Sequence, residues 1–243
     1  MTGASDIEQR RADLAKALEE LEARISRACV AAGRAREEVR LLAVTKTFPA
    51  ADAALLADLG LREFAENRGQ EAGPKAAALG ELRPGVPVRW HMVGRLQRNK
   101  ARSVVRWAAE VQSVDSIRLA DALDTAVGAE EAGPLDVFVQ ASLDGDPARG
   151  GCPLDELAAL ADHIAGAPGL RLRGLMAVAP LGADPEPAFE RLARARESLC
   201  RDHPDATELS AGMSGDLEPA ITHGSTCVRV GTALLGGRGL ASP

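Results

Sequence analysis

The sequence predicts an α/β protein that forms a single eight-stranded (β/α)8 barrel, preceded by one additional helix. Short apolar segments alternate with helical patterns along the chain, and this alternation is typical of a parallel sheet with helices outside it. Eight such units fit within 243 residues, which is a usual length for such a barrel. No glycine- or proline-rich stretch is long enough to be a linker, so we expect one domain overall.

Residues 1–35 predict an amphipathic helix that packs on the barrel, and residues 36–243 predict the barrel itself. Ser5 and Glu8 match a capping box, which marks a helix start. Apolar residues then follow at helical spacing, namely Ile7, Leu14, Leu18, Leu21 and Ile25. Gly33 is a stop signal. We expect this helix to cover the bottom of the barrel.

The remaining elements follow in strict alternation. The predicted strands cover residues 41–46, 63–66, 88–93, 110–114, 136–141, 171–178, 208–210 and 227–230. The predicted helices between and after them cover residues 50–59, 69–79, 100–108, 117–127, 154–165, 187–201 and 216–223. An open doubly wound sheet is the alternative for this pattern, and the count of eight strands favours the barrel.

The composition argues against several classes of protein. A formal net charge of −6 argues against general nucleic-acid binding, which depends on an excess of Lys and Arg. The four cysteines are scattered and form no CxxC pair, which suggests neither a metal site nor a disulfide framework. The N-terminus lacks a signal-peptide pattern, and no apolar run reaches the ~20 residues that span a bilayer. We therefore expect a cytoplasmic protein without nucleic-acid, metal or membrane binding.

Lys46 ends the first predicted strand and Asn67 directly follows the second, so both lie at C-terminal strand ends and are candidate site residues. Barrels of this type carry their chemistry at that end. An amine at the tip of a buried strand is costly unless it reacts or pairs. The structural alternatives are a lysine that extends to solvent for Lys46 and a turn residue that starts the next helix for Asn67.

Two small loops late in the sequence predict a phosphate site. The Gly/Ser segment 210–216 follows the seventh strand, and Gly231 and Thr232 follow the eighth. Glycines let the backbone approach an anion, and a helix start adds free N–H groups. The alternative is an ordinary loop in which Ser214 caps the next helix. Because loops seven and eight are the usual phosphate site of these barrels, a lysine opposite them indicates a phosphorylated aldehyde, above all pyridoxal phosphate.

Three further features have two interpretations each. Arg229 shares a strand face with Gly231 and should point into the barrel, either toward the site or into a structural ion pair. His91 lies on the third strand and either faces the site or is a hydrogen-bonded core histidine. The basic stretch 95–106 is either a solvated helix face or a contact for an acidic partner.

Together these segments resemble the YggS/PROSC family of pyridoxal phosphate homeostasis proteins. The resemblance covers the chain from about residue 36 to 237, and its motifs occur in the family's order: LLAVTKTFPA, FAENRGQEA, WHMVGRLQRNK, QSVDS, RLRGLMAVAP, LSAGMSGDLEPAITHGST and VRVGTALLG. Each motif alone is modest, whereas the ordered set is specific. The chain departs from the usual motifs at Ala65, Arg68, Arg95 and Ala211.

The resemblance implies a barrel like the N-terminal domain of alanine racemase, with pyridoxal 5'-phosphate held as a Schiff base on Lys46. It implies Arg229 beside the pyridine nitrogen and Asn67 near the ring. It also implies phosphate contacts from the two late loops, namely from Ser210, Met213, Ser214, Gly231 and Thr232. The family is regarded as a carrier and regulator of vitamin B6 and amino-acid pools without an established catalytic activity, so apo-enzymes that need the cofactor are the implied partners.

The alternative function is a pyridoxal phosphate enzyme with the same barrel, such as an amino-acid racemase. Two-sided proton transfer needs a second positioned acid or base, which in the resembling racemases is a tyrosine on a C-terminal β-domain. This chain has no tyrosine and ends just after the eighth predicted strand, which leaves His91 as a substitute base. A Schiff-base aldolase is a third possibility, but such enzymes usually carry the lysine on a later strand than Lys46. We therefore expect a non-catalytic monomer.

Overall fold

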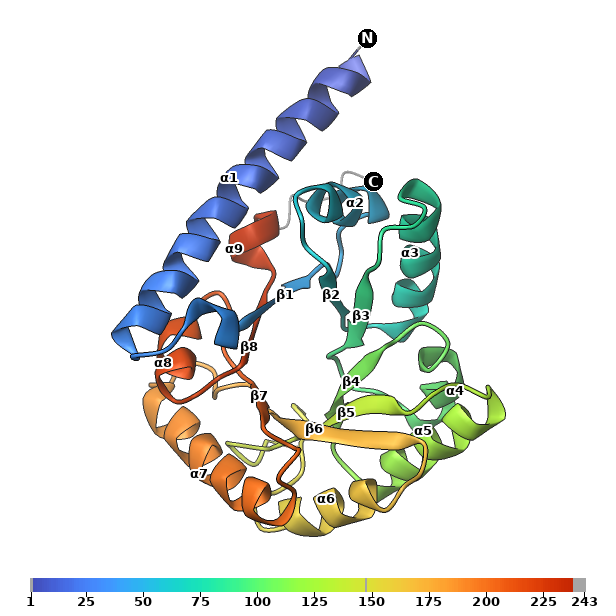
Figure 1. Ribbon diagram of the computed structural model, residues 1–243, viewed down its shortest axis with the longest axis vertical. Helices are drawn as coiled ribbons and strands as arrows, with labels where there is room; N and C mark the ends of the chain where they lie inside the picture. The colour runs from blue at the N-terminus through green and yellow to red at the C-terminus, as the bar shows by residue number, and fades with distance from the viewer. Residues whose placement is uncertain (1, 147, 238–243) are drawn as a thin grey trace.

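Eight parallel strands close into a barrel in the computed structural model, which describes residues 2–146 and 148–237 (Figure 1). The strands are β1 (Arg40–Val44), β2 (Glu63–Glu66), β3 (Arg89–Met92), β4 (Glu110–Val114), β5 (Leu135–Gln140), β6 (Leu170–Met176), β7 (Glu208–Ser210) and β8 (Cys227–Val230). They follow one another around the barrel in chain order, and β8 pairs with β1, where Val230 lies opposite Ala43. This closure confirms the predicted barrel and excludes the open doubly wound sheet.

Helices surround the barrel on its outer side (Figure 1). They are α2 (Ala50–Asp58), α3 (Gly69–Leu82), α4 (Ala101–Val104), α5 (Ile117–Ala129), α6 (Leu157–Ala165), α7 (Glu186–Asp202), α8 (Leu217–Thr222) and α9 (Thr232–Leu235), with 3₁₀ turns at η1 (Arg36–Glu38) and η2 (Arg98–Lys100). The helix predicted over 100–108 is shorter than expected. It ends at Val104 because the chain must turn into β4, and the Ala109 N–H already donates to Trp90 O in β3.

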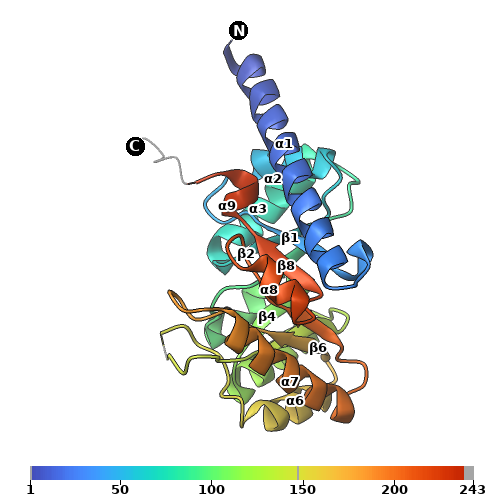
Figure 2. The same ribbon diagram turned by 90° about the vertical axis from the view of Figure 1, so that its left-hand side faces the viewer.

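The N-terminal helix α1 (Thr2–Ala31) lies along the side of the barrel, against α2, α8 and α9 (Figures 1 and 2). Its buried side chains join a cluster with outward-facing residues of β1 and β8, namely Leu14, Leu21, Ile25 and Cys29 with Leu41, Val228 and Val230. Because α9 has only 4 residues, α1 covers the seam between β8 and β1. It does not cover the bottom of the barrel, which corrects the expectation from sequence.

The start of α1 also differs from the sequence prediction. The helix begins at Thr2, so Ser5 and Glu8 lie inside its first turns and both are exposed to solvent. A serine side chain that faces water is tolerated in a helix, so the capping-box pattern did not mark a boundary here.

Apolar side chains fill the layer between the strands and the helices. Charged groups fill the interior of the barrel at the N-terminal ends of the strands. The first residues of β1, β2, β4 and β7 meet there. Arg40 lies 2.5 Å from Glu208, 3.4 Å from Glu63 and 3.6 Å from Glu110. Buried charges are tolerated when they are paired in this way. These ion pairs therefore close the interior on the side of the barrel away from the strands' C-terminal ends.

His91 is part of this interior network. Its Nδ1 lies 2.8 Å from Glu110 Oε1, and its Nε2 contacts Glu63. Burial lowers the pKa of His91, but the two carboxylates outweigh it and hold that pKa above its ordinary value. The core interpretation of His91 is therefore the one that the structure supports.

Two other expectations concern absent features. In the described part of the chain, the four cysteines are free thiols, and no cluster of three His, Cys, Asp or Glu side chains could hold a metal ion. Among the helices of residues 2–146 and 148–237, none combines the length and the apolar character needed to cross a bilayer.

Candidate functional site

A cavity of about 770 Å³ opens at the C-terminal ends of the strands. Its volume lies within the range of roughly 300–1,000 Å³ that is usual for small-molecule sites. The strand and loop ends that line it bring together most of the residues predicted from sequence, namely Lys46, Asn67, Met213, Ser214, Arg229, Gly231 and Thr232. Ser210 does not line the cavity. The barrel topology places these residues around one hollow because all parallel strands end on the same side.

Lys46 follows β1 at the edge of this cavity. Its side chain is exposed, and among the described residues its amine has no hydrogen-bond or ion-pair partner. The next residue, Thr47, has φ of 69°, a left-handed conformation that is unusual for a β-branched residue. The chain thus turns sharply after Lys46 and leaves the amine accessible from the cavity.

Asn67 reaches the cavity through a close contact between the ends of β2 and β3. A Cβ atom on Gly94 would lie 2.2 Å from the Asn67 carbonyl oxygen, so only glycine permits this approach. Asn67 lies in the bend between β2 and α3, and Arg68 occupies the position before the first residue of α3 without a capping side-chain bond. Asn67 is thus a turn residue near the helix start that also lines the cavity.

The loops after β7 and β8 present hydrogen-bond donors to the cavity. Among the described residues, the N–H groups of Ser214, Gly215 and Gly231 have no acceptor within the protein. The hydroxyls of Ser214 and Thr232 lie on the same two loops, and Ser214 Oγ accepts a bond of 3.3 Å from the Ala233 N–H. This set of donors suits a tetrahedral anion.

Two contacts fix the shape of the first of these loops. Gly212 has φ of 90°, and a Cβ there would lie 2.7 Å from Ala220 Cβ. The Met213 N–H donates to Asp216 Oδ1 over 2.6 Å. The loop can therefore pack tightly on α8 while its outer N–H groups stay free.

Arg24 of α1 also holds this loop, which sequence reasoning missed. Its Nη1 donates to the Ser214 carbonyl oxygen over 2.7 Å, and its Nη2 donates to Glu218 Oε2 over 2.6 Å. The partners are separated by 190 residues, and no local spacing in α1 distinguishes Arg24 from the other arginines of the helix.

Arg229 is buried beneath the cavity, with 4% of its surface exposed. Its Nη1 donates to Ser210 Oγ and its Nη2 to the Ala177 carbonyl oxygen, both over 2.7 Å. No carboxylate of the described residues pairs with it, so the ion-pair interpretation is wrong. Burial lowers the pKa of Arg229 from its ordinary value. A guanidinium has five N–H donors, and donors therefore remain for a ligand.

Ser210 lies behind Arg229 and is fully buried. Its hydroxyl accepts from Arg229 and donates to Gln112 Oε1 over 2.7 Å, and Gln112 Nε2 donates to Glu110 over 2.6 Å. Burial raises the pKa of Glu110, but its bonds to His91 outweigh this and the pKa falls to about 2. Ser210 thus orients Arg229 through a chain of bonds that ends on a carboxylate.

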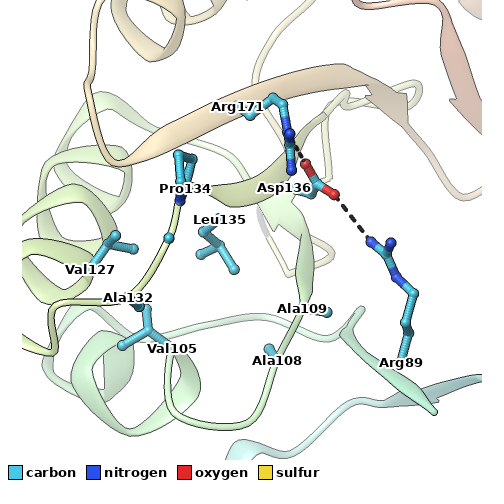
Figure 3. A pocket seen from close by; sticks show the side chains of 11 residues that line it. Arg89, Val105, Ala108, Ala109, Val127, Ala132, Pro134, Leu135, Asp136 and Arg171 are labelled. Atoms are coloured by element: carbon cyan, nitrogen blue, oxygen red, sulfur yellow. Dashed lines mark hydrogen bonds and ion pairs between the residues drawn. The ribbon is translucent and has the colours of Figure 1, made fainter. Parts of the chain in front are cut away.

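A smaller cavity of about 330 Å³ lies at the other end of the strands. Figure 3 shows Arg89 and Arg171 both pointing at Asp136, with distances of 3.1 and 2.5 Å. The other lining side chains that Figure 3 labels are apolar. Because its charged groups pair with one another and it holds none of the predicted site residues, this hollow is not the candidate site.

The basic stretch 95–106 lies at the surface. Arg102 and Arg106 both bond to Glu130, with Nε–Oε distances of 2.5 and 2.9 Å, and Arg95 and Arg98 are exposed. This is the arrangement of a solvated face.

Comparison with known proteins gives the family. Residues 17–239 match the model of the alanine racemase N-terminal domain. The pyridoxal phosphate homeostasis protein of Mycobacterium leprae is 47% identical, with 99% of this chain and 100% of that protein covered. The Escherichia coli protein of the same name is 40% identical, with 93% and 97% covered.

Solved structures agree with this result. PipY of Synechococcus elongatus, solved with PLP bound, superimposes with a TM-score of 0.79 at 33% identity, covering 92% of this chain and 100% of PipY. Alanine racemase of Corynebacterium glutamicum has a TM-score of 0.68 at 16% identity, covering 96% of this chain and 62% of the racemase, and shares the fold alone. The chain therefore belongs to the pyridoxal phosphate homeostasis proteins, which carry the alanine racemase N-terminal domain.

Proposed function

We propose that this protein binds pyridoxal 5'-phosphate (PLP) in the cavity at the C-terminal ends of the strands and holds it for vitamin B6 homeostasis and amino-acid balance. The single observation that carries the proposal is the arrangement of this cavity. As far as residues 2–146 and 148–237 show, one hollow is faced by an amine without a partner, a set of free N–H and hydroxyl donors, and a buried arginine that pairs with no carboxylate. The names of the relatives and the PLP-bound structure of PipY support the same ligand.

The chemistry of the lining fits each group of this cofactor. The Lys46 amine suits the aldehyde, with which it would form a Schiff base. The donors of Ser214, Gly215, Gly231 and Thr232 suit the phosphate. When bound, PLP supplies an aldehyde for amines and a ring that withdraws electrons. The remaining donors of Arg229 suit the ring nitrogen, and Asn67 would lie near the ring.

Arg229 supports a holding role over a catalytic one. A guanidinium has donors only and does not lose its proton in proteins. It can donate to an unprotonated ring nitrogen but cannot keep that nitrogen protonated, as a carboxylate would. The ring is then a weaker electron sink, and a bound amino acid would be little activated.

The ionisable side chains of the cavity also support a holding role over a catalytic one. Among the described residues that line the cavity, the ionisable ones are Lys46 and Arg229. A racemase needs a second acid or base at the reacting carbon, and His91 is committed to Glu63 and Glu110 in the interior. Transfer of PLP to apo-enzymes from a cytoplasmic monomer belongs to the same proposal.

The test is covalent trapping of the cofactor. The purified protein is mixed with PLP, its absorbance spectrum is recorded, and borohydride reduction is followed by digestion and mass spectrometry. We expect a pyridoxyl adduct on Lys46, and none on the exposed Lys16 as an internal control. A protein that gains no absorbance band and no adduct at Lys46 would refute the proposal.

A further inference from the structure

A buried ion pair lies directly behind Lys46, between the ends of β1 and β2 and helix α3. Lys75 of α3 donates to Glu66 Oε1 and, over 2.8 Å, to the carbonyl oxygen of Thr45. The Thr45 hydroxyl donates to the same Glu66 oxygen over 2.6 Å. The side chains of Glu66 and Lys75 are 0% and 10% exposed. Two charges are thus withdrawn from water next to the residue that precedes Lys46.

Fold stability alone does not account for this pair. Desolvating two charges is costly, and apolar replacements of buried ion pairs are often as stable or more stable. Glu66 Oε2 is also buried without a partner among the described residues, which adds to the cost. Such a pair indicates that a specific geometry is being maintained.

The geometry maintained is that of the chain around Lys46. The Thr45 N–H donates to Ala65 O over 3.0 Å, and its carbonyl oxygen accepts from Lys75 and from the Phe48 N–H. Every polar group of Thr45 is therefore bonded. Thr47, on the other side of Lys46, has φ of 69°, and such a conformation persists only when its surroundings determine it.

The same carboxylate links two parts of the site. Glu66 immediately precedes Asn67, so the bond from Thr45 to Glu66 ties the end of β1 to the end of β2. None of Thr45, Glu66 and Lys75 lines the cavity. They cannot touch a ligand there, and any effect they have on it must act through Lys46 or Asn67.

We infer that Thr45, Glu66 and Lys75 form a brace that positions Lys46 for Schiff-base formation. This inference rests on the proposed function. In that reaction the Lys46 nitrogen joins the aldehyde carbon, and the aldehyde oxygen leaves as water with the two protons of the neutral amine. The brace residues are positioning residues: they set the direction from which the amine reaches the cavity and leave the phosphate donors unaffected.

The first experiment separates attachment from binding. The variants are Lys75→Met, Thr45→Val and Thr45→Ser, with Lys16→Met on the exposed face of α1 as the control. The rate of covalent attachment of PLP is followed by absorbance. Affinity is measured for pyridoxamine phosphate, which has the same phosphate and ring but no aldehyde. We expect Lys75→Met and Thr45→Val to slow attachment by about tenfold or more, while pyridoxamine phosphate affinity changes less than about twofold.

Thr45→Ser is the conservative rescue, because it keeps the hydroxyl that Glu66 accepts from, and we expect its attachment rate to be close to that of the wild type. Thermal unfolding checks whether Lys75→Met is folded. If it is not, Thr45→Val tests the brace by itself, since this variant leaves the ion pair of Lys75 and Glu66 intact. Equal losses of attachment rate and of pyridoxamine phosphate affinity would mean a general structural role and would overturn the brace.

A second measurement needs no cofactor. Hydrogen exchange of the backbone amides of residues 44–48 is followed in the protein without PLP. We expect faster exchange at Thr45 and Phe48 in Lys75→Met and in Thr45→Val than in Lys16→Met. Unchanged exchange together with an unchanged attachment rate would refute the inference. If the wild type binds neither PLP nor pyridoxamine phosphate, the proposed function fails, and the exchange data still decide whether the brace exists.

Discussion

Arg24, on the N-terminal helix, donates a hydrogen bond of 2.7 Å to the carbonyl oxygen of Ser214, in the loop after β7 that we propose binds the phosphate. The same guanidinium pairs with Glu218 at the start of α8. The helix that precedes the barrel in the sequence therefore contacts the candidate site from behind. The position of the Ser214 N–H and hydroxyl depends on a residue outside the (β/α) units.

Arg24→Gln is expected to weaken PLP binding. The variant loses the ion pair with Glu218 and shortens the reach to Ser214, and one such hydrogen bond contributes about 1 kcal/mol, which is roughly a fivefold change in the dissociation constant. Arg34→Gln is the control, because Arg34 bonds Ile221 and Ser225 at the other end of α8. Titration of both variants with pyridoxamine phosphate tests this, and equal losses in the two would contradict the role of Arg24.

Removing the two hydroxyls of the late loops should loosen the cofactor and spare the fold. Ser214→Ala combined with Thr232→Val removes donors to the phosphate, and each charge-assisted bond is worth roughly 1.5–3 kcal/mol. Thr222→Val is a matched control, because this exposed threonine donates to Glu218 O on α8, away from the cavity lining. Unchanged affinity for pyridoxamine phosphate in the double variant would mean that the phosphate is bound elsewhere.

Lys46→Ala is expected to lose covalent attachment but to keep measurable affinity for pyridoxamine phosphate, because the phosphate donors do not depend on the amine. Absorbance spectra and equilibrium titration distinguish the two effects.

In the wild type we expect no racemisation of alanine at about 1 s⁻¹, the low end for ordinary enzymes. Turnover above that rate, followed by chiral chromatography, would favour the racemase alternative.

The pair of His91 and Glu110 predicts a dependence of stability on pH. The pKa of His91 is raised in the folded state, so its contribution is complete below its ordinary value of 6.5 and is lost as the pH rises through the folded value. The pKa of Glu110 is lowered to about 2, so its contribution is complete above its ordinary value of 4.5 and is lost as the pH falls toward 2.

Urea unfolding at pH 5 to 9 should therefore give a free energy of unfolding that declines on the alkaline side. His91→Gln should flatten this decline, because glutamine does not titrate. His203→Gln is the control, since His203 pairs with Asp162 near the surface. A profile for His91→Gln that still parallels the wild type would show that another group causes the decline.

The alternation of apolar and helical segments was sufficient to predict the barrel. β2, β4, β7 and β8 have the predicted bounds, because short buried strands between turn signals leave little freedom for their ends. The topology then determines that the C-terminal strand ends share one cavity. This is why residues as distant as Lys46 and Thr232 could be assigned to one site from sequence.

The features that could not be predicted depend on which distant side chains meet and on how deeply a side chain is buried. The spacing of residues along the sequence does not encode either property. Arg24 meets Ser214 only because α1 docks beside α8. Lys75 meets Glu66 on the outer side of the strands, and the sequence gives no sign that either charge is buried. Ser210 lies one layer too deep to line the cavity, since alternation along β7 gives its direction but not its depth.

The position of α1 has a consequence for the order in which the molecule is made. This helix precedes every strand of the barrel in the chain, yet two of the elements it packs against, α8 and α9, follow β7 and β8. The seam between β8 and β1 thus joins segments that lie far apart in the sequence, and such contacts form only once both segments are present. A nascent chain in which α8 and α9 are not yet made therefore lacks the loops after β7 and β8 that line the cavity.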